Sequence, residues 1–192
     1  YDTLFGSDDK GNVRPQMVDK YSVSKDNKVW TFTLRPGLKF SDGSPVTSED
    51  VIASLDRWGK RDVLGQKMYA AMESLTAQGP HGFQMKFKQP FGLVLEALGK
   101  SGPLVPFIMP KRVASTPADK QIDDLTGSGP FTLETWQAKD VLRMKRNPDY
   151  WRGEAKMSRV VLRHFQESQT LRLMIEKGDL DIANNMAVSD IN

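Results

Sequence analysis

The sequence predicts a mixed α/β fold, and three patterns indicate it. Apolar and polar residues alternate with a period of two over 30–35 and again over 83–88, which is typical of strands with one buried face. Over 47–59, apolar residues recur instead at helical spacing behind a capping signal. Strand and helix patterns follow in mixed order along the rest of the chain, so we expect both kinds of element throughout the structure.

Composition excludes several classes of protein. Of the 192 residues, 39% are hydrophobic and 27% are charged, which provides enough apolar mass for a core. No apolar run approaches the roughly 20 residues that span a bilayer, so we expect at most a peripheral relation to a membrane. The 27 basic and 24 acidic residues are interleaved. This argues against nucleic-acid binding, since such proteins concentrate their positive charge. The absence of cysteine excludes disulfides and thiolate metal sites.

The first half of the chain contains the clearest helix signal. Thr47 begins a capping pattern in which Asp50 reaches back to the start of the helix, and Gly59 provides a stop. The alternating segment before it ends at Pro36-Gly37, a turn pair that separates it from a short strand. In this half we expect strands over 1–5, 28–35, 38–40 and 83–87, and helices over 47–59, 64–75, 92–98 and 111–114.

The second half predicts a hairpin, followed by a strand, a helix and a last strand. Residues 137–140 separate two alternating segments and predict the hairpin turn. Ser168 is expected to cap the helix and Gly178 to stop it. The expected elements are strands over 131–136, 141–146, 160–164 and 179–183, and a helix over 169–177.

Residues that could carry catalysis are sparse. The two histidines, His81 and His164, are predicted to lie in a turn and at the end of a strand. A zinc site needs three or four clustered ligands, and a catalytic triad needs a histidine beside an activated serine; neither pattern is present. Segment 127–130 lacks the spacing of a phosphate loop, and Pro130 removes a backbone donor. The sequence therefore predicts no enzyme, no metal site and no cofactor.

Four segments of the sequence, two of which include patterns described above, together resemble a single family. Their order and rough spacing are similar to those of the extracellular solute-binding proteins of peptide ABC transporters, a group that includes oligopeptide-, dipeptide- and nickel-binding proteins. The resemblance covers nearly the whole chain, although members of the family are more than twice as long. The segments are 30–51 (WTFTLRPGLKFSDGSPVTSEDV), 127–131 (GSGPF), 146–151 (RNPDYW) and 178–183 (GDLDIA).

The resemblance implies a periplasmic binding protein-like first lobe with an inserted α+β subdomain. Residues 1–11 and 128–192 would form part of the main subdomain, and residues 12–127 the inserted one. The chain would cross between the two near 11–12 and 127–128. The second lobe, which supplies much of the ligand pocket in this family, would lie outside the chain.

The resemblance also implies a transport function. The chain would belong to the solute-binding component of an ABC importer, which captures peptides or similar small solutes and delivers them to a membrane permease. We expect a monomer in the periplasm, or a lipoprotein on the cell surface of an organism with one membrane. The parent reading frame is expected to begin with a signal peptide.

Five residues are candidates for ligand contact by this resemblance. Asn184 and Asn185 lie just after the Gly-Asp-x-Asp strand, in the segment that faces the cleft in peptide binders, and their amides could pair with a peptide main chain. Tyr1, Asp2 and Thr3 border the cleft in the family. An alternative interpretation is that the two asparagines merely end a strand in a turn.

Other functions stay open at this point. The same scaffold could bind nickel, a sugar or another non-peptide solute, although the scarcity of histidine argues mildly against a directly ligated transition metal. A peptide hydrolase would need a nucleophile or metal cluster, and the sequence contains neither pattern. A peptide-binding chaperone or signalling receptor on the same fold is a third alternative.

Overall fold

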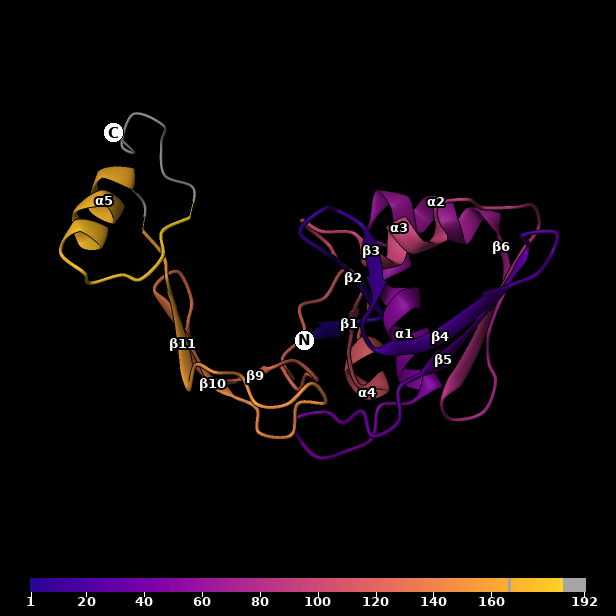
Figure 1. The fold of residues 1–192 in the computed structure, drawn as a ribbon, viewed down its shortest axis with the longest axis horizontal. Coiled ribbons are helices and arrows are strands. Elements are labelled where there is room, and N and C mark those ends of the chain that lie inside the picture. The colour runs from indigo at the N-terminus through magenta and orange to yellow at the C-terminus, as the bar shows by residue number, and fades with distance from the viewer. Residues whose placement is uncertain (166, 185–192) are drawn as a thin grey trace. The chain divides into compact units, whose positions relative to one another are not determined.

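The computed structural model describes residues 1–165 and 167–184 (Figure 1). The chain forms two compact units. The first comprises Tyr1–Thr132 and Arg146–Lys156. The second comprises Leu133–Lys145 and the described part of the segment that begins at Met157.

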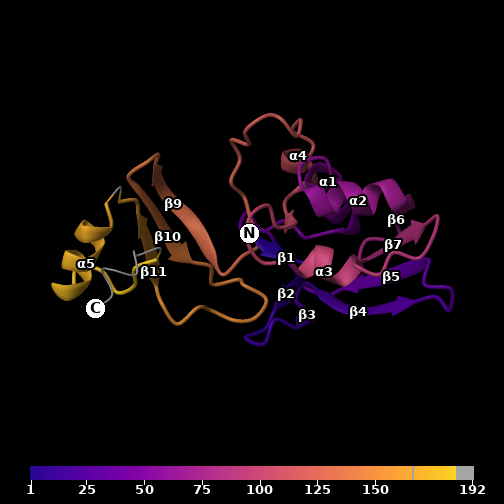
Figure 2. The same cartoon turned by 90° about the horizontal axis from the view of Figure 1, so that it is seen from above.

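A four-stranded antiparallel sheet forms the frame of the first unit. Its strand order is β4 (Val18–Val23), β5 (Val29–Leu34), β7 (Gly82–Phe87) and β6 (Met72–Ala77). Helices α1 (Ser48–Gly59) and α2 (Val63–Ala71) lie on one side of this sheet (Figure 2). Because apolar residues alternate along β5 and β7, a single face of the sheet is buried beneath the helices.

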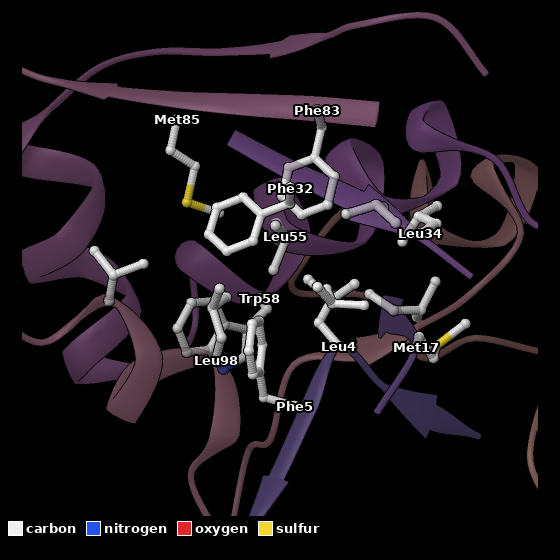
Figure 3. Packing of buried hydrophobic residues seen from close by; sticks show 14 of the residues in the cluster. Leu4, Phe5, Met17, Phe32, Leu34, Leu55, Trp58, Phe83, Met85 and Leu98 are labelled. Carbon is white, nitrogen blue, oxygen red and sulfur yellow. The ribbon is translucent and has the colours of Figure 1, made fainter. Parts of the chain in front are cut away.

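The core of the first unit lies between this sheet, α1 and the first strands of the chain (Figure 3). Phe32 and Phe83 lie opposite each other on β5 and β7, and their rings stack 4.8 Å apart. Leu4 and Phe5 enter the same core from the amino-terminal end, and Leu55 enters from α1. The amino-terminal residues of the chain are therefore packed in one hydrophobic cluster with the rest of the unit.

Short elements complete the first unit. Strand β1 (Asp2–Thr3) pairs antiparallel with β8 (Phe107–Ile108), and β2 (Phe5–Ser7) pairs antiparallel with β3 (Val13–Pro15). The remaining helices are α3 (Val94–Gly99) and α4 (Lys111–Ala114).

The second unit is built on a three-stranded sheet in the order β11-β10-β9. Strand β9 (Phe131–Gln137) starts in the first unit and turns into β10 (Val141–Arg146) through a bond from the Asp140 N–H to the Gln137 carbonyl. Strand β11 (Arg159–Arg163) pairs antiparallel with β10. Helix α5 (Ser168–Glu176) follows, and the chain leaves it through Gly178 at a φ of 75°.

The capping pattern is confirmed at the start of α1. Oδ2 of Asp50 accepts the Thr47 backbone N–H at 2.8 Å and the Thr47 hydroxyl at 2.7 Å. Oδ1 of the same carboxylate accepts the backbone N–H of Lys111 at 2.7 Å. Asp50 therefore fixes two helix starts, those of α1 and α4.

Most predicted elements are present, at similar bounds. The confirmed strands are β5, β7, β9, β10 and β11, and the confirmed helices are α1, α3, α4 and α5. The start of the chain is also extended, as expected, but in two short strands. The cap of α5 is different, because Glu167 occupies the cap position and Ser168 is the first helical residue.

The predicted helix over 64–75 is wrong in its second half. Helix α2 ends at Ala71, and Met72 turns the backbone into the extended strand β6. The apolar spacing of this segment fits a helix, but antiparallel pairing with the next strand, β7, stabilises the extended conformation.

Two predicted short strands are also wrong. At 38–40 the structure has one isolated bridge, between Lys39 and Pro45, around a tight turn. The segment 179–183 forms no strand, because the N–H groups of Asp179 and Leu180 both donate to the carbonyl of Met174 at the end of α5. That bonding folds the segment back against the helix instead of extending it.

The sequence pattern also missed strand β4. Only Val18 is fully buried in this edge strand, and four of its six residues are exposed. A strand that is exposed on both faces has no alternation to detect.

The function of Gly59 differs from the predicted stop signal. A Cβ atom at this position would lie 2.5 Å from Cδ2 of Tyr69, so glycine allows the Tyr69 ring to pack against the end of α1. The Tyr69 hydroxyl then donates to Asp56 at 2.8 Å. Burial and this carboxylate raise the pKa of Tyr69.

The bounds of the two compact units differ from those of the predicted subdomains. Residues 1–11 pack in the first unit together with the segment 12–127, and only the later residues form a second unit. The division into 1–11 with 128–192 and 12–127 concerns the complete first lobe, and it stays a prediction. Within residues 1–165 and 167–184, no helix is long and apolar enough to cross a membrane.

The caps of α1 and α4 can be tested by substitution. Asp50→Ala removes the acceptor of two backbone N–H groups, so the free energy of unfolding should fall by about 2–3 kcal/mol. Thr47→Ala should cost about 1 kcal/mol. Urea unfolding followed by circular dichroism measures both.

Glu49→Ala is the control and should leave the midpoint of unfolding unchanged, because its ion pair with Lys111 is exposed. Equal effects of Asp50→Ala and Glu49→Ala would contradict the assignment.

Candidate functional site

Asp2 is the most constrained of the predicted site residues. It lies in β1 and is 2% exposed. Its Oδ1 accepts the Thr3 backbone N–H at 2.8 Å and the side-chain amide of Gln16, and its Oδ2 accepts the indole N–H of Trp151 at 2.8 Å. The Tyr150 hydroxyl also bonds to it, and burial together with the Asp2 charge raises the pKa of Tyr150 to about 12. The carboxylate is thus occupied by groups of the first unit itself.

Trp151, which donates to Asp2, also contacts two arginine side chains. The guanidinium of Arg35 lies 4.9 Å from the centre of its ring, and that of Arg152 lies 5.5 Å from it. Nε of Arg35 donates to the carbonyl of Gln16 at 2.6 Å. The segment 146–156, β1 and the residues before β4 are therefore held at one place in the first unit.

Tyr1 is held by a pair of glycines. A Cβ at Gly129 would lie 2.5 Å from the carbonyl oxygen of Tyr1, and a Cβ at Gly127 would lie 3.1 Å from its ring. Only glycine lets the 127–130 connection pass this close. Between them Ser128 is 2% exposed, and its hydroxyl and that of Tyr1 have no hydrogen-bond partner in the described part of the chain.

A pocket of about 570 Å³ lies beside Tyr1 in the first unit. Its apolar walls include Tyr1, Trp58, Leu104 and Phe107. The rings of Tyr1 and Phe107 lie 5.6 Å apart, and the Trp58 indole N–H donates to the Leu104 carbonyl at 2.6 Å. Pockets of 300–1,000 Å³ with mostly apolar walls are typical of small-molecule sites.

One side of this pocket is positively charged. Arg57 is 7% exposed and donates to the backbone carbonyls of Thr116, of Pro117 at 2.6 Å and of Lys120 at 2.7 Å. Burial lowers the pKa of Arg57 from its usual value. Arg61, one helical turn further on, also lines the pocket and is exposed. Lys120 and Asp119 also line the pocket, which therefore combines apolar walls with three cations and one carboxylate.

The structure brings together only part of the predicted site. Strand β1 contains Asp2 and Thr3, and Tyr1 precedes it. Of these three residues, Tyr1 lines the pocket. Asn184 is exposed and belongs to the second unit, and Asn185 lies outside the described residues. Contact of these five residues with a ligand stays a prediction.

Sequence reasoning missed the pocket itself. Trp58 was interpreted as core packing, and it is 6% exposed, yet it also lines the pocket. Leu104 and Phe107 come from a proline-interrupted segment in which no function was predicted. The one local signal was the pair of arginines, Arg57 and Arg61, on either side of Trp58 at a helix end. Among the described residues, no group of three or more His, Cys, Asp or Glu could hold a metal ion.

Comparisons of the sequence with known proteins give consistent matches. The family described as "Bacterial extracellular solute-binding proteins, family 5 Middle" matches residues 12–192. The chain is 31% identical over 188 residues to the Escherichia coli (strain K12) protein named "Probable D,D-dipeptide-binding periplasmic protein DdpA", a match that covers 96% of this chain and 36% of that protein. It is 38% identical over 139 residues to the Sinorhizobium fredii "Probable peptide ABC transporter periplasmic-binding protein y4tO", covering 72% and 26%.

A solved structure matches in the same way. The binding protein MoaA from A. tumefaciens R10, in complex with mannopinic acid, is 28% identical to this chain with a TM-score of 0.79. That match covers 93% of this chain and 37% of MoaA. The chain thus spans little more than a third of the length of DdpA and of MoaA.

The anchor at Asp2 gives a testable prediction. Trp151→Phe keeps an aromatic ring between the two arginines but removes the N–H that Asp2 accepts, so the free energy of unfolding should fall by about 1–3 kcal/mol. Chemical denaturation followed by circular dichroism measures the change. Trp136→Phe is the matched control, since that side chain is 51% exposed and should tolerate the change. An unchanged midpoint for Trp151→Phe would show that the bond contributes nothing.

Proposed function

The chain belongs to family 5 of the bacterial extracellular solute-binding proteins, and on that premise we propose that it is part of the solute-binding component of an ABC importer. In this proposal the protein captures peptides or similar small solutes and delivers them to a membrane permease. The family is one of binding proteins, not of enzymes, and curated relatives named as peptide binders support the proposal.

The pocket beside Tyr1 is the observation that carries the proposal. It is large enough for a dipeptide-sized solute, and it has apolar walls together with polar groups on one side. The buried carboxylate of Asp2 holds β1 rigidly, and β1 positions Tyr1 at the pocket. A preorganised wall of this kind lowers the entropy lost when a ligand binds.

The guanidinium groups favour a solute with a carboxylate. The cations Arg57, Arg61 and Lys120 outnumber the one carboxylate of the lining, Asp119, and a guanidinium matches the geometry of a carboxylate. Peptides carry such a group. The alternative of a non-peptide small acid is favoured by the same observation, and the relative MoaA has mannopinic acid bound. Tyr1, Asp2, Thr3, Asn184 and Asn185 remain the proposed contacts on this chain for the ligand main chain.

The proposed compartment is the periplasm, because the curated relatives are named as periplasmic proteins. A lipoprotein on the outer surface is the proposal for an organism with one membrane. The proposed partner is the permease of the same importer, and the intact protein is proposed to act as a monomer.

Substitutions at the pocket test the proposal on the intact protein. The solute is first identified by mass spectrometry of the co-purified ligand. Phe107→Ala should then weaken its binding about tenfold in isothermal titration, because part of an apolar wall is lost. If the solute carries a carboxylate, Arg61→Gln should weaken binding of the solute more than binding of the derivative in which that carboxylate is an amide. Leu93→Ala, at an equally exposed apolar residue away from the pocket, should change nothing. Cleavage of added peptides would favour the hydrolase alternative instead.

A second test compares the 192-residue chain with the intact protein. High-affinity sites bury 70–90% of a small ligand, whereas one pocket wall leaves the other side in water. Each polar contact then contributes about 0.5–1.5 kcal/mol to the free energy of binding. A few such contacts must offset several kcal/mol of lost translational and rotational freedom of the ligand. We expect the chain alone to bind no tighter than about 1 mM. Micromolar binding with one ligand per chain would show that this chain holds a complete site.

A further inference from the structure

One face of the sheet in the second unit is strongly basic. In the β10–β11 pair, Val141 lies opposite Arg163, Arg143 opposite Val161, and Lys145 opposite Arg159. Residues directly opposite each other share a face of the sheet, and so do alternate residues of one strand. The basic face is therefore defined by four cations, Arg143, Lys145, Arg159 and Arg163.

Strand β9 adds an acid and an aromatic residue to this face. Glu134 forms an ion pair with Arg159 at 3.0 Å, which places Glu134 on the basic face. Trp136, two residues along the same strand, shares that face and is 51% exposed. The face thus carries four cations against one carboxylate. Arg143 and Arg163 form no ion pair with any residue of the described ranges 1–165 and 167–184.

The opposite face of the same sheet has a different chemistry. Its paired residues on β10 and β11 are Leu142, Met144, Val160 and Leu162, all apolar. Arg146, the last residue of β10, falls on this opposite face and forms an ion pair with Glu154 at 3.4 Å. Four of the five cations of these two strands therefore lie on one side, although Lys and Arg are interleaved with acids along the sequence as a whole. This segregation becomes visible only once the register of the two strands is known.

We propose that the basic face docks on anionic phospholipid headgroups at a membrane surface. Basic clusters are attracted to anionic lipids, and tryptophan is enriched where a protein meets the headgroup layer. A three-stranded sheet offers its cations side by side, with neighbouring strands about 4.8 Å apart. Trp136 favours a lipid surface over an acidic protein, because its half-exposed ring gains most in the amphipathic interface.

Such docking would be peripheral and sensitive to salt. Exposed charges are screened over about 8 Å at physiological ionic strength, so the attraction acts only close to the surface. It would raise the concentration of the protein beside a membrane without inserting any segment into it. The proposal is independent of the pocket in the first unit and of which solute binds there.

Vesicle sedimentation with the intact protein tests the proposal. The probes are vesicles of phosphatidylcholine mixed with phosphatidylglycerol, and vesicles of pure phosphatidylcholine. We expect binding to the anionic vesicles only, falling as salt is added. The double variant Arg143→Gln/Arg163→Gln should weaken this binding about 30-fold, since each cation contributes roughly one factor of five near an anionic surface. Trp136→Ala should weaken binding and leave its salt dependence unchanged.

A control of equal net charge separates the face from the protein's overall charge. Lys25→Gln/Lys67→Gln removes two exposed cations of the first unit and should leave vesicle binding intact. Thermal melts establish that each variant is folded, and the single variant Arg163→Gln replaces the double one if that variant melts early. Equal losses in both double variants, binding to pure phosphatidylcholine, or no binding to anionic vesicles would each overturn the proposal. The proposal would also be overturned if the basic-face variants bound anionic vesicles as tightly as the unaltered protein but lost binding to an acidic protein.

Discussion

The carboxylate of Asp2 is the constraint on which the first unit depends. It is buried, and besides the N–H of the next residue it accepts bonds from distant parts of the chain: from Gln16 before β4 and from Trp151, 149 residues away in sequence. A buried charge without such partners is unfavourable, so these partners must be in place together. Because β1 pairs with β8, the same anchor sets the position of Phe107 and thereby one wall of the pocket. Fold and candidate site thus share one interaction.

Local pattern predicted the elements whose stability is local. The α1 helix was recognisable because its cap, Thr47 with Asp50, and its apolar stripe are encoded within twelve residues. The elements that failed are those in which pairing with a neighbouring element overrides the local pattern. Residues after Ala71 form a strand because they pair with β7, and the segment 179–183 fails to extend because its N–H groups bond to the end of α5. The apolar spacing of a segment does not report such pairing, even where the partner is near in sequence.

The candidate site was less predictable than the fold, because its residues are far apart in the sequence. The resemblance to a family directed attention to consecutive residues such as Tyr1–Thr3, whereas the pocket is assembled from α1, β8 and the loops on either side of α4. Trp58 shows the difficulty most clearly, since its helical spacing predicts core packing and the same ring also faces the pocket. The GSGPF segment lacks the spacing of a phosphate loop, and the reason for its glycines is the backbone of Tyr1, which only the structure shows.

The return of segment 146–156 to the first unit has a consequence for the order of folding. The first unit is interrupted by a hairpin of the second, so it is incomplete until the ribosome has made residue 151. Contacts between residues so far apart in sequence form slowly, because a long loop must close before any bond is gained. During that interval the Asp2 carboxylate lacks the indole N–H of Trp151, and the apolar neighbours of β1, Leu4 and Phe5, are open to other chains. The first unit therefore completes its fold only after the segment that contains residue 151 has returned to β1, whatever the order in which its other strands form.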